Sequence, residues 1–473
     1  MCAATLSPAD AAPLTAPASP AGPLDEGLHL PEPPMIPLSA RAQMLRFNQR
    51  QIEFVFRARR ELGEVFQMRG TLPGNVAVTS HPDHVKSLFT ADPKIAPSVT
   101  GESPLRPIVG STSVLTAVGP RHLRQRKLLL PPFHGEAIAQ YVAMIEDVTA
   151  RELDSWPVGK PIALAPRMQT ITLDVIMAGI FGIEGKPKRG SEEWWLREAT
   201  RAILNASTHP LAQVTELRNA NRTEATGLLK RAIDLVDKPT YAIIRKRRAA
   251  ADVDDRRDVL SLLIGARTEE GEALTDEELR NELLTLVLAG HETTANQMAW
   301  AWERLVRTPD AHARLVDTVR AGGGAGDDDA SKHAIETTIT EAMRSRPVIP
   351  IIGRRVQVPW RLGEYAMPAG SVVSMSILLV HHREDLYPDP FAFRPERWDD
   401  RKPGTYEWIP FGGGIRRCLG AALAMAEQRV VVREMARRLD LEAATPEPEH
   451  AVHRNVTMIP SKGGRVVVRA RRA

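Results

Sequence analysis

Cysteine is scarce in this sequence of 473 residues, which contains Cys2 and Cys418 and no others. Two cysteines cannot form a framework of several disulfides, so we expect a reducing, cytoplasmic compartment. Long apolar runs are also lacking. No stretch reaches the roughly 18 apolar residues that a transmembrane helix needs, so we predict no membrane span. The N-terminus lacks the basic start and apolar stretch of a signal peptide, which argues against export.

A strong excess of one charge is missing as well. Lys and Arg total 62 and Asp and Glu total 58, which gives a net charge of +4. Such weak basicity argues against nucleic acid as a partner, because nucleic-acid binders carry clustered basic surfaces. Aromatic residues are sparse at 5%, but the hydrophobic fraction of 43% is ordinary for a globular chain and suffices for a large core.

The distribution of periodic segments predicts two parts of unequal order. Residues 1–40 are rich in Ala and Pro and lack periodicity, so we expect a disordered leader there. Residues 41–473 carry the helical and strand patterns and are expected to form one ordered domain. Helical spacing dominates, and the few strand-like segments are short. The pattern therefore predicts a mainly α-helical fold with a minor antiparallel β lobe.

The clearest element expected is a long helix near the middle of the chain. Thr275 to Glu278 form a capping box, and helical spacing continues from there to about Arg307. A second helix over 331–345 should stop at Pro347, because proline cannot continue a helix. Strand-like segments follow, and a C-terminal hairpin is expected over 456–470.

Cys418 lies in a glycine-dense turn directly before the last predicted helix. Residues 411–420 read Phe-Gly-Gly-Gly-Ile-Arg-Arg-Cys-Leu-Gly. Glycines let backbone N–H groups approach the sulfur, and the helix N-terminus adds positive potential. Both effects favour the thiolate, which is the form that binds metals. A lone cysteine is otherwise often a small buried hydrophobic residue.

This segment resembles the cysteine signature of the cytochrome P450 superfamily, F-x-x-G-x-R-x-C-x-G. The fixed positions are Phe411, Gly414, Arg416, Cys418 and Gly420. The resemblance extends over about residues 41–470 and implies the family's single triangular, mainly helical domain with a small sheet-rich lobe. It also implies a haem b cofactor whose iron takes Cys418 as its axial ligand, and thiolate ligation favours O–O cleavage.

A second motif lies inside the long helix, at Ala289-Gly290-His291-Glu292-Thr293-Thr294. The small Ala289 and Gly290 would let a flat ligand approach, and Gly290 would allow a local bulge that frees the Thr293 hydroxyl. Taken alone, the segment fits a close helix–helix contact better. Beside the cysteine signature it resembles the family's oxygen-activation motif, with Glu292 and Thr293 as the acid–alcohol pair. We interpret His291 as structural.

Glu341 and Arg344 form an E-x-x-R pair before Pro347, and Arg397 follows in the sequence Phe-Arg-Pro-Glu-Arg-Trp. The same spacing recurs elsewhere in the chain, where it can mean only an exposed helical ion pair. The order of Glu341, Arg344 and Arg397 ahead of the cysteine resembles the family's structural triad. The implied role is to lock the haem-binding region.

The two propionates of a haem require cations, and arginine offers permanently charged, bidentate donors. The resemblance points to Arg416, to His122 and Arg126 one helical turn apart, and to Arg354, with Arg355 as a register alternative. Each alone could be a solvated surface cation. A further basic face is expected to dock an acidic electron donor or to be an ordinary solvated surface; it comprises Arg121, Arg124, Lys127 and Arg417.

The resemblance implies a monooxygenase that activates O2 and hydroxylates or epoxidises a hydrophobic small molecule. The chain shows no flavin-binding extension after the cysteine, so we expect NAD(P)H electrons to arrive through a ferredoxin and a ferredoxin reductase. The predicted substrate pocket includes Ala289, Val348, Ile349 and Ile351. Their aliphatic character points to a steroid, terpenoid or fatty acid. Two alternatives stay open: a haem-thiolate enzyme that rearranges peroxides, and a non-catalytic haem sensor or carrier.

Overall fold

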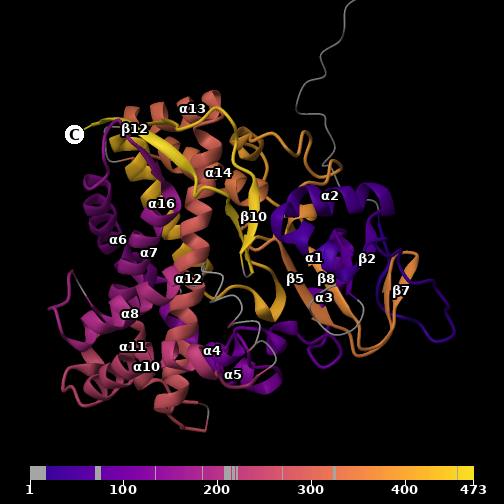
Figure 1. The fold of residues 1–473 in the computed structure, drawn as a ribbon, viewed down its shortest axis with the longest axis horizontal. Coiled ribbons are helices and arrows are strands. Elements are labelled where there is room, and N and C mark those ends of the chain that lie inside the picture. Colours follow the sequence, from indigo (N-terminus) through magenta and orange to yellow (C-terminus); the bar gives the residue numbers. More distant parts are fainter. Residues whose placement is uncertain are drawn as a thin grey trace, which may run out of the picture.

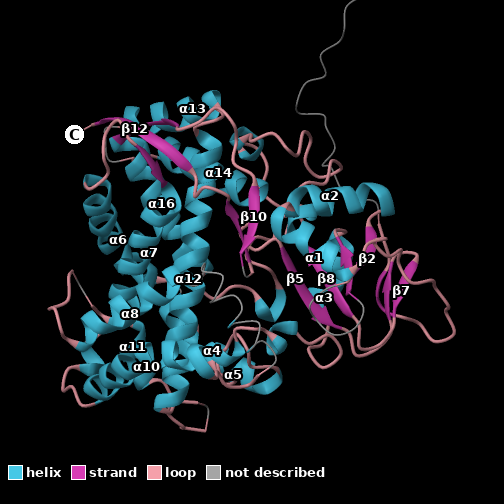
Figure 2. Cartoon of the chain, in the orientation of Figure 1, coloured by secondary structure: helices cyan, strands magenta, loops and turns pink. Residues whose placement is uncertain are grey.

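Helices make up most of the computed structural model (Figures 1 and 2). The structure describes residues 18–472 except 70–75, 134, 184, 207–214, 216–218, 220–221, 269, 323–325 and 455. The α-helices are α1 Ala40–Gln49, α2 Gln51–Leu62, α3 Pro82–Thr90, α4 Arg106–Val109, α5 Gly119–Leu129, α6 Glu136–Asp154, α7 Leu164–Phe181, α8 Glu192–Ala206, α10 Gly227–Arg248, α11 Val259–Gly265, α12 Asp276–Leu305, α13 Pro309–Ala321, α14 Asp329–Ser345, α15 Ile377–Val380 and α16 Ala421–Arg438.

Short strands form four sheets in the described part of the chain. The largest has the order β2-β3-β8-β5, and the others are β1-β6-β7, β4-β12-β9 and the hairpin β10-β11. The strands are β1 Ala21–Pro23, β2 Val65–Met68, β3 Val76–Thr79, β4 Pro161–Ala163, β5 Ile351–Arg355, β6 Trp360–Leu362, β7 Tyr365–Met367, β8 Val372–Ser376, β9 Leu439–Ala443, β10 Ala451–Arg454, β11 Thr457–Pro460 and β12 Arg465–Arg471. The predicted fold class is confirmed, with one parallel pair, β3 and β8, within the otherwise antiparallel lobe.

Helix α12 runs through the middle of the molecule and carries much of its core (Figure 1). The predicted capping box starts it. The Glu278 N–H donates to Thr275 Oγ1 at 3.1 Å, and the Thr275 N–H donates to Glu278 Oε2 at 3.1 Å. The helix packs along α7 and also contacts α10, α14 and α16. Trp300 and Trp302 are fully buried, so this helix can hold a side chain in a fixed place deep in the molecule.

The disordered leader was predicted over residues 1–40, but part of the stretch from residue 18 to residue 40 is ordered. Strand β1 pairs with β6, the Ser19 N–H donates to Asp83 Oδ2 at 2.9 Å, and Ile36 is buried. A few pairings and one apolar contact order this stretch, although its composition resembles that of a disordered segment. Residues 1–17 lie outside the described residues, so the rest of that prediction is not tested.

The predicted C-terminal hairpin is also wrong in its pairing. Both of its strands exist, but β11 pairs with β10, whereas β12 pairs with β4 and β9. Gly463 and Gly464 adopt positive φ angles between the two strands and turn the chain into a different sheet. Within the described residues, no helix has the length and apolar character required to span a bilayer.

Candidate functional site

The turn that carries Cys418 is built from the predicted glycines. Gly412 and Gly414 adopt φ angles of 63° and 62°, in the left-handed region that favours glycine. A Cβ atom at Gly413 would collide with the Phe89 ring, and one at Gly414 would collide with the Phe89 carbonyl oxygen. The Cys418 N–H donates to the Phe411 carbonyl at 3.0 Å, and α16 begins three residues later. The turn is therefore pressed against α3 and held in one shape.

The Cys418 side chain is exposed on one side, although protein atoms crowd around it on the others. This crowding raises the pKa of the thiol, while the Gly420 N–H and the nearby Arg126 and Arg417 lower it. The sequence predicted a net shift towards the thiolate. The Gly420 N–H and the two arginines act in that direction, but without a bound metal the effect of burial on the pKa is larger. A metal ion on the sulfur would supply the remaining stabilisation, since coordination deprotonates a thiol.

Cations from three separate segments gather beside this turn. Burial lowers the pKa values of Arg354 and Arg416 to about 10 each, and Arg354 and Arg126 further lower that of Arg416. Burial lowers the pKa of His122 to about 4, and the field of Arg416, Arg126 and Arg354 adds to that shift. His122 is therefore neutral near pH 7 in this state. His122, Arg354 and Arg416 line one pocket together with Phe89.

The charges of this cluster show whether its residues fit a haem. Every charged group that shifts the pKa of His122 is another cation. Like charges brought together under burial are costly unless an anion neutralises them. Two carboxylates of a propionate type would do so, and Cys418 would offer sulfur to the iron. The residues therefore fit the group that the sequence resemblance implies.

The register of β5 determines which of Arg354 and Arg355 can join the cation cluster and contact a propionate. The Arg354 side chain is buried and lies over the Phe89 ring at 5.9 Å from its centroid. Arg355 points the other way and binds Glu102, with Nε–Oε1 and Nη2–Oε2 distances of 2.7 and 2.6 Å. Neighbouring strand residues face opposite sides, so a single strand presents one arginine to the cation cluster.

The remaining cations have partners on the chain itself. Arg416 donates to the carbonyls of Val114 and Leu115 at 3.0 and 3.2 Å and also to that of Ala117. Arg126 donates to the Arg417 carbonyl at 2.7 Å, and so ties α5 to the cysteine turn.

The predicted motif in α12 has a different local geometry from the one expected. The helix is continuous from Asp276 to Leu305, so the predicted bulge at Gly290 is not seen. A Cβ atom at Gly290 would lie 3.3 Å from Ile176 Cδ1, so this glycine allows the close approach of α7. Ala289, by contrast, is exposed, although its helix is largely buried. The Thr293 hydroxyl donates to the Ala289 carbonyl at 2.6 Å.

Glu292 contacts the β10–β11 hairpin, whereas the backbone of His291 contacts α7. Glu292 Oε1 accepts from the Thr457 hydroxyl at 3.3 Å and lies 3.3 Å from Arg454 Nε. Burial raises the pKa of Glu292, and Arg454 and Thr457 counteract this shift. His291 is buried, its carbonyl accepts from the Thr172 hydroxyl of α7 at 3.0 Å, and burial lowers its pKa to about 4. This position fits the structural role predicted for His291.

The structure brings Glu341, Arg344 and Arg397 together as predicted. Arg344 binds Glu341 through two bonds of 2.8 Å, with both side chains fully buried, and Arg397 Nε lies 3.1 Å from Glu341 Oε2. The Arg394 N–H and the Trp398 indole N–H also donate to this carboxylate, at 2.9 and 3.1 Å. The sequence reasoning missed these two donors, although both stand in the Phe-Arg-Pro-Glu-Arg-Trp segment that it used.

One other pair with the same spacing behaves as an ordinary surface pair. Arg201 and Glu198 are 3.8 Å apart, with 62% and 37% of their side chains exposed, against zero for both members of the Glu341–Arg344 pair. Sequence position, not spacing, therefore identified the structural pair.

The predicted pocket residues do not share one environment. Val348 and Ile351 pack in a core cluster with Trp300 and Met458, whereas Ile349 packs against a different cluster. Their role in binding a substrate stays a prediction.

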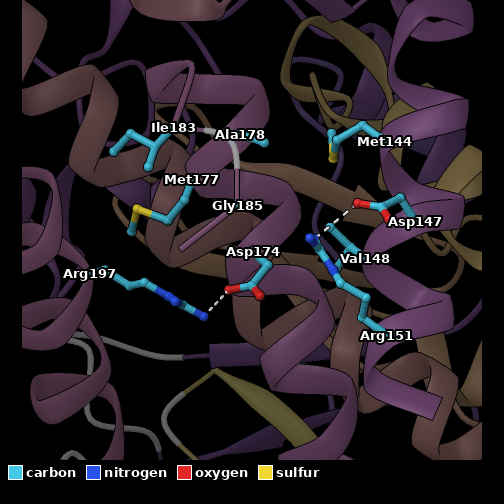
Figure 3. A pocket seen from close by; sticks show the side chains of 10 residues that line it. All are labelled: Met144, Asp147, Val148, Arg151, Asp174, Met177, Ala178, Ile183, Gly185 and Arg197. Atoms are coloured by element: carbon cyan, nitrogen blue, oxygen red, sulfur yellow. Dashed lines mark hydrogen bonds and ion pairs between the residues drawn. The ribbon is translucent and has the colours of Figure 1, made fainter. Parts of the chain in front are cut away.

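A separate pocket lies between α6, α7 and α8 (Figure 3). Figure 3 shows its charged side chains directed at one another. Asp174 pairs with Arg197 at 2.5 Å, and Asp147 pairs with Arg151 at 3.1 Å. Met144 and Met177 are among its apolar lining residues. None of the site residues predicted from the sequence lines this pocket.

Comparison with known proteins gives a consistent result. A family model described as cytochrome P450 matches residues 30–468. A Mycobacterium tuberculosis protein named "Putative cytochrome P450 135B1" is 35% identical over 443 residues, which cover 93% of this chain and 92% of that protein. A second protein from this organism, named in the same way as cytochrome P450 137, is 37% identical over 414 residues, or 87% and 84% of the two chains. The solved structure of retinoic acid bound cyanobacterial CYP120A1 aligns with a TM-score of 0.77 at 22% identity, covering 93% of this chain and all of that one.

Removing the Glu341 carboxylate should unfold the region around the cysteine turn more easily. Glu341→Ala leaves Arg344 and Arg397 buried without their anion, which costs about 3–5 kcal/mol for a buried pair. Chemical denaturation followed by circular dichroism measures this loss. Glu336→Ala is the matched control, because Glu336 lies on the same helix and pairs with Arg429 at an exposed site. Its expected cost is below about 1 kcal/mol. Equal losses in the two variants would contradict a structural role particular to Glu341.

Proposed function

The chain belongs to the cytochrome P450 family, and we propose that it hydroxylates or epoxidises a hydrophobic small molecule of the steroid, terpenoid or fatty-acid class. Members of this family are haem monooxygenases, and this chain is one. The observation that carries the assignment of the site is the gathering of Arg354, Arg416 and His122 beside Cys418, with no anion among the charged groups that shift the pKa of His122. When bound, the haem supplies reductive activation of O2 with electrons that originate from NAD(P)H.

The chain's own residues hold the cofactor and place it. We assign the iron ligand to Cys418 and the propionate contacts to Arg354, Arg416, His122 and Arg126. A propionate beside His122 would raise the pKa of the imidazole from its value of about 4, because an opposite charge favours the protonated ring. The exposed Ala289 leaves room on the facing side of α12 for the macrocycle.

Proton movement is assigned to Thr293 and Glu292. The Thr293 hydroxyl proton is held on the Ala289 carbonyl, so the oxygen presents its lone pairs to an incoming proton donor. Glu292 adjoins Thr293 on the helix, and burial raises the pKa of its carboxyl, which brings the group closer to the range in which it exchanges protons near neutral pH. We therefore assign to Glu292 the uptake of protons from solvent and their release towards the site that Thr293 lines.

Separate electron-transfer proteins are proposed as partners, with a ferredoxin and a ferredoxin reductase as the specific pair. Arg121 and Leu123 of α5 are exposed, as are Ile415 and Arg417 of the cysteine turn. Exposed cations and apolar side chains suit an acidic protein donor. Arg124 contributes less than predicted, because it pairs with Glu278 at 2.9 Å and lies 3.6 Å from Glu272.

A cytoplasmic location is part of the proposal. It rests on the scarcity of cysteine and on the thiolate chemistry assigned to Cys418, which a reducing compartment preserves. Fractionation of the native host measures it, and recovery of the protein from an oxidising compartment would contradict it.

The function is tested with the purified haem-loaded protein. Optical titration against steroids, terpenoids and fatty acids should give a blue-shifted Soret band with one of these classes. That compound, supplied with ferredoxin, reductase, NAD(P)H and ¹⁸O2, should yield a product with one labelled oxygen atom.

The rate at which the ferredoxin reduces the haem protein should fall as ionic strength rises, because the docking surface is charged. Ligand binding without an oxygenated product would contradict the proposal and favour a sensor or carrier. Product formed from peroxide without reductant would favour the peroxide-rearranging alternative.

Thr293→Ala should waste reducing equivalents. The variant loses the hydroxyl that receives a proton, whereas the Ala289 carbonyl keeps its backbone donor, so the helix persists. Product per NAD(P)H consumed should fall several-fold, and peroxide should rise. Both are measured in the reconstituted system, with Thr293→Ser, which retains the hydroxyl, as the matched control. Unchanged coupling of electrons to product in Thr293→Ala would exclude the proton role.

A further inference from the structure

The β10–β11 hairpin contacts the acid of the proposed proton pathway directly. Arg454 and Thr457 are register partners at the end of the hairpin, and the Thr457 hydroxyl also donates to the Arg454 carbonyl at 2.9 Å. Both side chains reach Glu292, the hydroxyl by a hydrogen bond and the guanidinium by an ion pair, each at 3.3 Å. The carboxyl group is thus directed towards the hairpin by two groups of different chemistry.

This contact is shielded from water, so its charge matters. The Arg454 and Glu292 side chains are 17% and 16% exposed, whereas typical surface pairs of this chain, such as Arg57–Glu61, are about half exposed or more. Burial raises the pKa of Glu292, and Arg454 followed by Thr457 counteracts it. Arg454 is also the charged group that lowers the pKa of the adjacent His291. Among the described residues, no other charged group is found to shift the pKa of Glu292.

The hairpin itself is fixed by contacts that do not involve Glu292. The Met458 N–H donates to the Val348 carbonyl at 2.7 Å, and the Trp300 indole N–H donates to the Met458 carbonyl at 3.0 Å. The His453 ring packs edge-on against Phe47 of α1, with 5.0 Å between centroids. The position of Arg454 therefore depends on α1, on α12 and on the segment after Pro347.

We propose that Arg454 is a positioning residue for the monooxygenase reaction: from the hairpin it fixes the direction and the charge of the Glu292 carboxyl, and so sets the pH range in which Glu292 can supply protons. Thr457 assists by holding the same oxygen atom. Arg454 does not touch the reacting atoms and acts through Glu292. The inference rests on the proposed proton role of Glu292.

The experiment compares Arg454→Met with Arg454→Lys in the haem-loaded ferric protein, without turnover. The infrared band of the protonated Glu292 carboxyl, assigned by its loss in Glu292→Gln, is followed as a function of pH. Arg454→Met should move the midpoint upward, because the carboxylate loses its neighbouring cation. Arg454→Lys, which retains the charge, should stay near the wild-type midpoint. Arg57→Met is the control, since Arg57 also pairs with a glutamate but lies on the exposed face of α2.

A second readout links this midpoint to the reaction. In the reconstituted system, the pH profile of product per NAD(P)H should shift in Arg454→Met in the same direction and to the same extent as the infrared midpoint. If Arg454→Met does not fold, Thr457→Val removes the hydrogen bond and should shift both readouts upward by a smaller amount.

The outcomes separate this inference from the proposed function. An unchanged midpoint in Arg454→Met, with reduced coupling in Glu292→Gln, overturns the role of Arg454 and leaves the proton role of Glu292 intact. Unchanged coupling in Glu292→Gln overturns the proton role itself and the inference with it. A shifted midpoint without a shifted pH profile shows an ion pair that has no effect on the reaction, and likewise overturns the inference.

Discussion

Buried positive charge beside a cysteine is the constraint on which the rest of this structure depends. Arg354 and Arg416 lie close enough for one to lower the pKa of the other, and both act on His122. A protein interior does not hold such a cluster cheaply unless an anion joins it. The haem b of the family supplies two carboxylates and an iron atom, and Cys418 supplies the sulfur. Binding of the haem should therefore also stabilise this region of the folded chain.

Several unusual features of the chain serve to hold that arrangement in place. Gly413 and Gly414 let the cysteine turn press against Phe89, where any side chain would collide. The fully buried Glu341 gathers Arg344, Arg397 and the donors of Arg394 and Trp398, and so fixes the segment that leads into the turn. A buried carboxylate is tolerated here because every side of it is met by a donor. Helix α12 completes the site by presenting Ala289 and Thr293 from a rigid, largely buried frame.

Much of this could be predicted from the sequence, because local chemistry determined it. The capping box at Thr275, the glycine turn around Cys418 and the order of Glu341, Arg344 and Arg397 follow from short-range rules together with a family signature. The predictions failed where tertiary contacts decide. Strand β12 pairs with β4 and β9, and β1 orders part of a segment whose composition resembles that of a disordered leader. Gly290 packs against Ile176 of α7, which no pattern within α12 could reveal. The contact of Arg454 with Glu292 joins residues more than 160 positions apart, and it also could not be predicted.

The central claim is that Cys418 is the iron ligand at the cation cluster, and the carbon monoxide complex of the reduced protein tests it most directly. The wild-type protein should show the red-shifted Soret band of a thiolate-ligated haem, and Cys418→Ala should lose that band. A thiolate-type spectrum that persists in Cys418→Ala would contradict the assignment of Cys418 as the iron ligand and, with it, the placement of the haem beside the cation cluster.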